Sequence, residues 1–292
     1  QCLDFAGKLF LDPGDVVLCE SPSYLGALNA FNAYQPKFVE VPTDNGGLIP
    51  EELDKILETT PNCKFIYVIP DFQNPTGRTW SMERRQKFME VVNKHNLPVL
   101  EDNPYGELRY EGTILPSLKS MDTKGLVMFL GTFSKIFCPG LRLGWIAAEH
   151  SLLSEFVKIK QSADLHTSNF DQGVADAYME QYDLDEHVKE IVALYKHRRD
   201  LILESMEKYF PAGTEWTHPE GGLFLWLTFP EGVSARKVFN KCIEMKVAGV
   251  IGDAFYPNQK TDRSMRINYS NMPDNRIVEG IQRMAKAIKE CM

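Results

Sequence analysis

The stretch KFIYVIPDFQNPTGRTWSMERRQKFMEVVNKHNLPVLEDNPY, residues 64–105, contains the pattern that decides the fold. Its two outer parts, 64–70 and 97–102, include short apolar runs, which are typical of strands buried on both faces of a sheet. Between them, 81–96 has the apolar period of a helix, with Ser81 in the N-cap position. This order of strand, helix and strand is typical of a parallel sheet.

The same alternation extends to both sides of this stretch. Further apolar runs predict more strands, and residues 50–60 have the pattern of another helix. We therefore predict an α/β fold in which helices sandwich a mostly parallel sheet. The predicted strands outside the opening stretch are 15–21, 37–42, 126–132 and 143–149.

The pattern changes after residue 150. Segments 151–166 and 185–210 predict long helices, and 215–230 predicts antiparallel strands. Shorter helices and strands complete what reads as an α+β unit, so we place a boundary inside the second long helix. The predicted domains are a large one over residues 1–190 and a smaller C-terminal one over residues 191–292.

The composition argues against several classes of partner. Apolar residues make up 43% of the 292 residues and charged residues 25%, as in an ordinary globular protein. The formal net charge of −8 disfavours a nucleic-acid partner, and no apolar run approaches the ~20 residues that cross a membrane. Six cysteines without a CxxC pair, and six histidines without an HExxH pattern, predict a reduced, cytoplasmic protein with no metal centre.

A polar or aromatic side chain stands at the carboxyl end of several predicted strands: Tyr24, Asn74, Asp102 and Lys135. The carboxyl ends of parallel strands meet at one edge of a sheet, where ligands bind. Taken singly, each residue has an ordinary explanation: a solvated lysine, a capping or ion-paired carboxylate, a turn at NPTG, a tyrosine that covers the core. Their convergence favours a functional site over four separate ordinary explanations.

At EDNPY, 101–105, and GTFSK, 131–135, the pattern becomes specific to a known family. The chain resembles the class I and II aminotransferases, which are fold-type I enzymes dependent on pyridoxal 5'-phosphate (PLP). It is most similar to the 2-aminoadipate and kynurenine aminotransferases. The likeness includes PDFQNPTGR, GTFSKIFCPGLRLGW, PEGGLFLW and RINYS and covers essentially the whole chain. It implies that residues 1–190 form the PLP-binding domain.

The resemblance implies a role for each residue of the predicted site. Lys135 would form a Schiff base with the cofactor aldehyde and later move a proton between the substrate Cα and the cofactor. Asp102 would pair with the pyridine nitrogen and keep it protonated. Tyr105 and Asn74 would donate hydrogen bonds to the phenolic oxygen, and Tyr24 would stack on the ring.

Further residues of the pattern would hold two anionic groups. The resemblance implies that Thr132, Ser134 and Arg142 bind the cofactor phosphate, because they match the family pattern SKxxxPGxR and the residue types that flank it. It also implies that Arg266 in RINYS grips the substrate α-carboxylate as a bidentate fork, with Asn74 beside it. Both arginines also have an ordinary explanation as solvated strand charges.

The segment ADLHTSNFDQ, 163–172, resembles the family loop that approaches the active site of a neighbouring subunit, which implies a homodimer. Within it, His166 is better explained as a hydrogen-bonded loop residue than as a catalytic group. The family also has a stretch before CLDFAGKLF that helps to hold the phosphate at a helix N-terminus. We expect such a stretch to precede Gln1 in the complete protein.

The activity implied by the resemblance is transamination. An amino acid and a 2-oxo acid, with 2-oxoglutarate as the expected acceptor, would exchange amino and oxo groups by a ping-pong route. Two alternatives stay open: C–S β-elimination on the same fold, and the PLP-binding effector domain of a transcription regulator. Phe224 and Trp226 are either walls of an apolar substrate pocket or core residues, and the sequence specifies no preferred donor.

Overall fold

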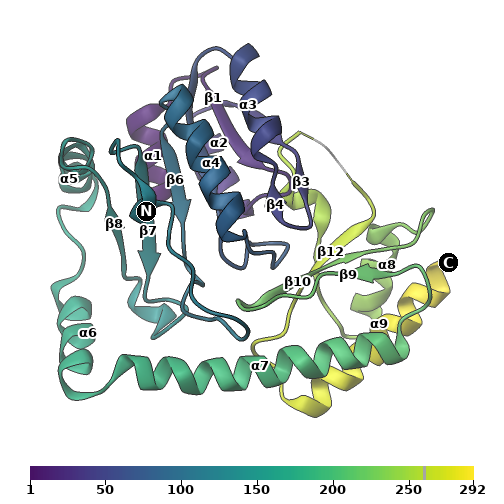
Figure 1. Cartoon of the computed structure of the whole chain (residues 1–292). Coiled ribbons are helices and arrows are strands. Elements are labelled where there is room, and N and C mark those ends of the chain that lie inside the picture. Colours follow the sequence, from purple (N-terminus) through teal and green to yellow (C-terminus); the bar gives the residue numbers. More distant parts are fainter. Residues whose placement is uncertain (259–260) are drawn as a thin grey trace.

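Two main sheets organise the chain in the computed structural model (Figure 1), which describes residues 1–258 and 261–292. The larger sheet has six strands in the order β2-β1-β5-β6-β7-β8. Their bounds are Val16–Glu20 (β1), Lys37–Val41 (β2), Cys63–Val68 (β5), Val99–Asp102 (β6), Val127–Thr132 (β7) and Gly144–Ala147 (β8).

All pairs in this sheet are parallel except the last. β1 pairs with β2 and β5, β5 with β6, and β6 with β7 in parallel, whereas β8 pairs antiparallel with β7. β1, β5 and β6 are largely buried, which explains why their sequences are apolar runs without alternation. The prediction of a mostly parallel sheet is confirmed. β8 is the exception because the chain between β7 and β8 turns back directly, without a crossover helix.

Helices cover both faces of the larger sheet, as predicted, and each face has its own apolar core. Phe5, Phe31 and Phe156 of α1, α2 and α5 belong to one core. Leu53 and Phe88 of α3 and α4 belong to the other. The bounds are Cys2–Phe10 (α1), Leu25–Asn32 (α2), Pro50–Thr59 (α3), Met82–His95 (α4) and His150–Asp164 (α5).

The smaller sheet is antiparallel, with the order β11-β12-β10-β9, and packs with α7, α8 and α9. α7 contacts two cores: Val188 and Ile191 pack against a small core that includes Tyr105, and Ile202 and Met206 belong to the core of the smaller sheet. The boundary near residue 190 falls within this helix and stays a prediction. The bounds are Leu184–Tyr209 (α7), Glu215–Trp216 (β9), Phe224–Thr228 (β10), Ala235–Glu244 (α8), Val250–Ile251 (β11), Ser264–Asn268 (β12) and Asp274–Cys291 (α9).

Some elements were not predicted from the sequence: α2, α6 (Asn169–Gln181) and the hairpin of β3 (Thr43–Asp44) and β4 (Gly47–Leu48). The expectation that residues 163–172 form a loop is wrong at both ends, because α5 continues to Asp164 and α6 begins at Asn169. α6 has a single buried side chain, that of Ala175, so its sequence shows no apolar stripe. By contrast, Ser81 caps α4 as predicted.

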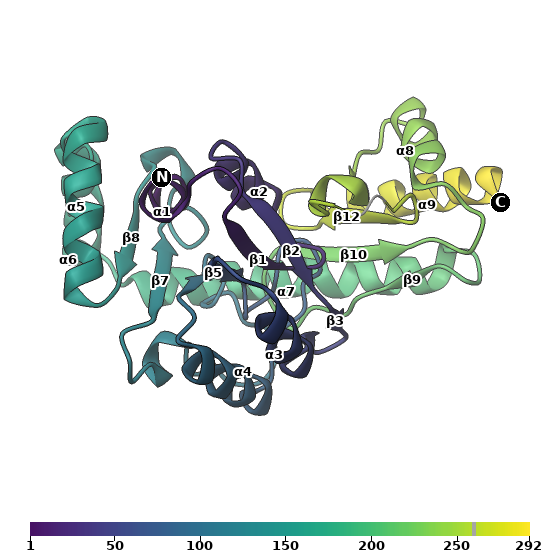
Figure 2. The same ribbon diagram turned by 90° about the horizontal axis from the view of Figure 1, so that it is seen from above.

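The ends of the molecule are marked by helices. Figure 2 shows α5 and α6 at one end and α8 and α9 at the other, with α7 running between them. None of the helices within residues 1–258 and 261–292 is both long enough and apolar enough to cross a membrane.

Candidate active site

The residues predicted at strand ends lie at the carboxyl edge of the larger sheet. Asp102 is the last residue of β6, and Lys135 follows shortly after β7. Asn74 lies in the loop after β5, and Tyr24 precedes α2 in the connection after β1. Burial raises the pKa of Tyr24 and that of Tyr105, and the nearby Asp102 carboxylate adds to both shifts. The structure thus brings these side chains into one cluster.

Arg266 connects the smaller sheet to this cluster. It lies on β12, and its Nη1 donates a 2.8 Å hydrogen bond to Oδ1 of Asn74. Its guanidinium lies over the rings of Phe224 and Phe255, 4.1 and 5.0 Å from their centroids. Burial lowers the pKa of Arg266, and its Nε is buried without a hydrogen-bond partner among the described residues. A half-buried guanidinium with unused donors is suited to an anionic ligand.

Asp102 has a partner that sequence analysis missed. Tyr67 of β5 is fully buried and donates a 2.6 Å hydrogen bond to Oδ2 of Asp102. Burial raises the pKa of Asp102 to about 6, and the hydrogen bond from Tyr67 acts in the opposite direction. A tyrosine within an apolar strand is an ordinary core residue in sequence, so only the pairing of β5 with β6 reveals this contact.

Tyr105 and Asn74 form the buried centre of the cluster. Nδ2 of Asn74 donates a long hydrogen bond of 3.4 Å to the Tyr105 hydroxyl. Phe224 packs edge-on against the ring of Tyr105, with the ring centroids 6.0 Å apart. Burial raises the pKa of Tyr105, so its hydroxyl stays protonated at neutral pH and can donate a hydrogen bond.

Lys135 is half-buried and has no ion-pair or hydrogen-bond partner for its amine among the residues that the structure describes. Burial lowers the pKa of this amine, and the positive charges of Arg142 and Arg266 lower it further. A lowered pKa increases the unprotonated fraction at neutral pH. The unprotonated amine is the form that attacks an aldehyde.

The loop after β7 holds its shape through short-range hydrogen bonds. The Thr132 hydroxyl donates to the Leu143 carbonyl at 3.0 Å and accepts from the Ser134 amide at 3.1 Å. Exposed Arg142 donates from Nη1 to Ser134 Oγ at 3.4 Å and to the Pro139 carbonyl at 3.0 Å. Ser134 and Arg142 therefore lie together, whereas the Thr132 hydroxyl already bridges two parts of the loop.

His166 lies in the connection between α5 and α6, not among the hydrogen-bonded groups of the cluster. The residue is exposed, and its Nδ1 is 2.9 Å from the backbone oxygen of Thr167. This agrees with the expectation of a hydrogen-bonded loop residue.

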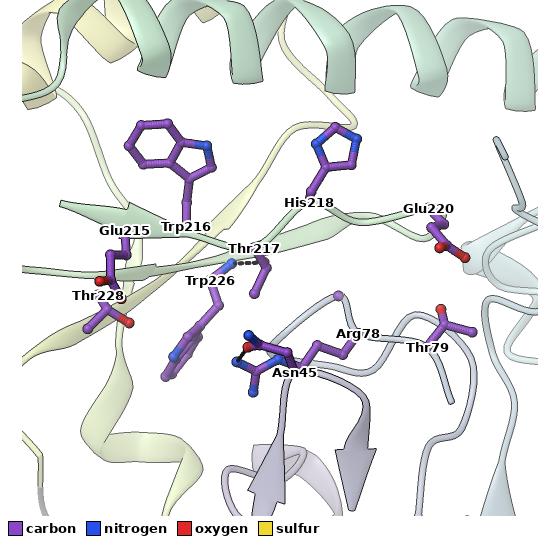
Figure 3. Close-up of a pocket in the computed structure, with 11 residues that line it drawn as sticks. Asn45, Arg78, Thr79, Glu215, Trp216, Thr217, His218, Glu220, Trp226 and Thr228 are labelled. Atoms are coloured by element: carbon purple, nitrogen blue, oxygen red, sulfur yellow. Dashed lines mark hydrogen bonds between the residues drawn. The ribbon is translucent and has the colours of Figure 1, made fainter. Parts of the chain in front are cut away.

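A pocket of about 580 Å³ is lined by Trp226, the cross-strand neighbour of Arg266, and by Gly77 of the loop that carries Asn74 (Figure 3). Figure 3 shows Trp226 on one side of the strands and Trp216 on the other. The two aromatic residues considered for a substrate pocket, Phe224 and Trp226, are two residues apart on β10 and therefore lie on the same face of the smaller sheet. Trp226 lines this pocket, and Phe224 lies between Tyr105 and Arg266.

The groups in the cluster fit PLP, the cofactor implied by the resemblance. Lys135 offers an amine with a lowered pKa, and Ser134 with Arg142 offers an anion-binding pair. Asp102 offers Oδ1, which has no hydrogen-bond partner within the described ranges. No group of three or more His, Cys, Asp or Glu side chains suited to a metal ion occurs in residues 1–258 and 261–292.

Comparisons with known proteins agree with this geometry. Residues 1–284 match the profile of the family described as aminotransferase class I and II. The chain is 43% identical over 296 residues to aromatic-amino-acid aminotransferase 1 of Thermococcus litoralis, covering 100% of this chain and 71% of that relative. It matches the crystal structure of Pyrococcus horikoshii kynurenine aminotransferase in complex with PMP, with a TM-score of 0.96 and 42% identity, over 99% of this chain and 73% of that one.

A second solved structure is similar. LysN, the alpha-aminoadipate aminotransferase of Thermus thermophilus, was solved with N-(5'-phosphopyridoxyl)-L-leucine. It matches with a TM-score of 0.95 and 34% identity, over 99% of this chain and 75% of that one. The fold and the family resemblance inferred from the sequence are both confirmed.

Proposed function

We propose, from the premise that this chain belongs to the class I and II aminotransferase family, that it exchanges amino and oxo groups between an amino acid and a 2-oxo acid. Membership makes it an aminotransferase with PLP as cofactor. The finer parts of the proposal are 2-oxoglutarate as the acceptor, a ping-pong order of two half-reactions, and Lys135 as the point of covalent attachment.

We also propose that the protein acts as a homodimer in the cytoplasm. Apolar side chains exposed on or beside α6, such as Phe170 and Tyr182, support a subunit interface at this end of the molecule. The cysteines support a reducing compartment, because all six are free.

PLP, when bound, supplies a protonated aromatic ring that withdraws electrons from the substrate Cα. Asp102 would accept the ring N–H with Oδ1, the oxygen that Tyr67 leaves available. Tyr105 and Asn74 would bind the phenolic oxygen from the neighbouring strand ends, and the ring of Tyr24 would pack against the cofactor ring.

Lys135 would hold the cofactor and then act as the base. As the free amine it would accept the proton from the substrate Cα and, once protonated, act as the acid that gives that proton up. Burial, Arg142 and Arg266 lower the pKa of Lys135. The lowered pKa supports attachment to the cofactor and removal of the Cα proton, because each requires the unprotonated amine.

Arg266 would bind the substrate α-carboxylate. Its Nη1 is engaged by Asn74 and its Nε is buried, whereas its Nη2 has no partner among the described residues and is the donor left for a ligand. Phe224 and Phe255 hold the plane of the guanidinium and exclude water from it. A fixed planar fork suits a planar carboxylate in a bidentate contact.

The observation that carries this proposal is the unpaired amine of Lys135 beside Arg142 and Arg266, with its lowered pKa. The test uses the complete protein, PLP and a panel of amino donors with 2-oxoglutarate. In Lys135→Ala we expect the donor-dependent absorbance change to vanish and turnover to fall by more than roughly 10³-fold. Lys158→Ala, an exposed lysine on α5, is the control and should behave like the wild type.

Two outcomes would contradict the proposal. A Lys135→Ala protein with the absorbance change of the wild type would remove Lys135 from the chemistry. Wild-type protein that cleaves sulfur-containing donors without converting 2-oxoglutarate to an amino acid would favour C–S β-elimination instead.

A further inference from the structure

Tyr67 and Asp102 form a buried pair on neighbouring strands. In the parallel register of β5 and β6, Tyr67 lies opposite Leu100, and Asp102 is two residues beyond Leu100 on the same face. Both side chains therefore leave the sheet on one face, and Tyr67 reaches along it towards the strand end. The hydroxyl oxygen of Tyr67 is 2.6 Å from Oδ2 of Asp102, the length of a strong hydrogen bond to a carboxylate.

The ring of Tyr67 is fixed by packing. It is fully buried and meets the ring of Phe31 edge-on, with centroids 5.7 Å apart. Phe31 is also fully buried and packs edge-on against Phe65 at 5.1 Å. A hydroxyl held in this way loses little further entropy when it binds a carboxylate, and water does not compete for the bond.

We infer that Tyr67 is a positioning residue that holds the carboxylate of Asp102 in the orientation needed to pair with the ring nitrogen of PLP. The inference rests on the proposed function, because it assigns that pairing to Asp102. The Tyr67 hydroxyl donates to Oδ2 of Asp102. Oδ1 has no hydrogen-bond partner in the part of the chain that the structure describes, so it can accept the ring N–H. Without Tyr67, the carboxylate would lose its fixed orientation, and Oδ2 would be left without this partner.

The charge environment of Asp102 supports the same role. Burial raises its pKa to about 6, and the hydrogen bond from Tyr67 counteracts that rise. Tyr67 therefore favours the charged carboxylate as well as its orientation. Other titratable groups electrostatically coupled to Asp102 are Tyr24, Tyr105 and the Cys2 thiol.

The test compares Tyr67→Phe with Tyr34→Phe in the complete protein. Tyr34 donates a 2.8 Å hydrogen bond to Oδ1 of Asp4 and packs against the same core, so the control removes a similar bond outside the site. In Tyr67→Phe we expect the Kd for PLP, measured by fluorescence titration of the apoprotein, to rise about tenfold. Turnover should fall about tenfold, and KM for the donor should stay within about twofold of the wild-type value. Tyr34→Phe should change none of these values.

The pH dependence adds a readout that a loss of packing would not produce. Losing the Tyr67 hydrogen bond raises the pKa of Asp102, so a larger fraction of the carboxyl is neutral at low pH. The loss of PLP affinity in Tyr67→Phe should therefore be greater at about pH 6 than at about pH 8. An equal loss at both pH values would contradict the inference.

A double-mutant cycle with Asp102→Asn decides whether Tyr67 acts through Asp102. If it does, Tyr67→Phe should change the Kd for PLP by less than about twofold in the Asp102→Asn background. A full tenfold loss in that background, or an unchanged Kd in the single variant, would overturn the inference. Failure of the proposed function would look different, because wild-type protein would then show no Lys135-dependent absorbance change with PLP.

Discussion

Arg266 and Arg142 flank Lys135 and are held in opposite ways. Arg266 is enclosed, since it lies over the rings of Phe224 and Phe255 and bonds Asn74 at 2.8 Å. Arg142 is exposed and contacts its own loop, at 3.4 Å to Ser134 and 3.0 Å to a backbone carbonyl. The first arginine is fixed where two sheets meet, and the second is positioned by a local turn.

The difference follows from where each arginine lies in the fold. A strand of the smaller sheet places Arg266 between two aromatic rings and beside Asn74, so its geometry is set before any ligand arrives. Arg142 has a left-handed backbone conformation with φ of 56°, and its contact with Ser134 is long for a hydrogen bond. We therefore expect the shape of the side chain to matter at Arg266 and mainly its charge to matter at Arg142.

Of the substitutions at the two arginines, Arg266→Lys should have the largest effect, because it keeps the charge and removes the fork. We expect kcat/KM for amino donors to fall roughly 100-fold, mostly through KM, because a bidentate contact with the substrate carboxylate is lost. Steady-state kinetics at saturating PLP measures this. A donor KM equal to that of the wild type would contradict the assignment of Arg266 to the carboxylate.

Arg78→Lys is the matched control for this substitution. Arg78 also bonds an asparagine, at 2.9 Å to Oδ1 of Asn45, but it lines the pocket of Figure 3 rather than the cluster. Its replacement should change kcat/KM by less than about twofold. An effect as large as that of Arg266→Lys would mean that the substitution acts through general packing.

The second effect is smaller and concerns Arg142. Arg142→Gln should raise the Kd for PLP about tenfold, because one charge-assisted contact with the phosphate is lost. In Arg142→Lys the Kd for PLP should stay within about threefold of the wild-type value, because lysine keeps the positive charge that we expect to matter at this position. Titration of the apoprotein with PLP measures both. Equal losses in the two variants would show that shape matters at Arg142 too.

The parts of the site that could be predicted from sequence are those whose position follows from the order of strands and helices along the chain. Lys135, Asp102 and Asn74 each follow a strand directly, and the ends of parallel strands converge whatever the details of packing. The mostly parallel sheet could be predicted for the same reason, since buried strands and amphipathic helices alternate along the chain.

The contacts that could not be predicted depend on register or on packing between distant segments. Tyr67 reaches Asp102 only because β5 and β6 pair in one register. Phe255 reaches Arg266 only because the segment Gly252–Phe255, which follows β11, packs against β12. α6 was missed because nearly all its side chains are exposed, which leaves no apolar period to detect.

A further effect links both arginines to Lys135. Burial lowers the pKa of Lys135, and Arg142 and Arg266 lower it further. Covalent attachment of PLP requires the unprotonated amine, so its rate is lost as pH falls through this pKa. Arg142→Gln removes a positive charge, raises the pKa and should move the profile to higher pH by less than about one unit. The rate of attachment followed by absorbance between about pH 6 and pH 10 measures the shift, and a move to lower pH would contradict it.

The smallest effect distinguishes two hydroxyls in the loop after β7. Ser134 offers its hydroxyl to Arg142, whereas Thr132 bridges the Leu143 carbonyl and the Ser134 amide. Ser134→Ala should raise the Kd for PLP about fivefold, the loss of one hydrogen bond worth about 1 kcal/mol, and leave the melting temperature unchanged.

Thr132→Val should weaken PLP binding and also lower the melting temperature by a few degrees, because it leaves the Ser134 amide without its partner in the absence of cofactor. The contrast matters more than either value. If both variants bind PLP less tightly but only Thr132→Val melts earlier, the loop is shaped by Thr132, and Ser134 with Arg142 is left to meet the phosphate. If Ser134→Ala is the one that melts earlier, the long contact between Ser134 and Arg142 stabilises the loop, and Arg142 is fixed in advance as Arg266 is.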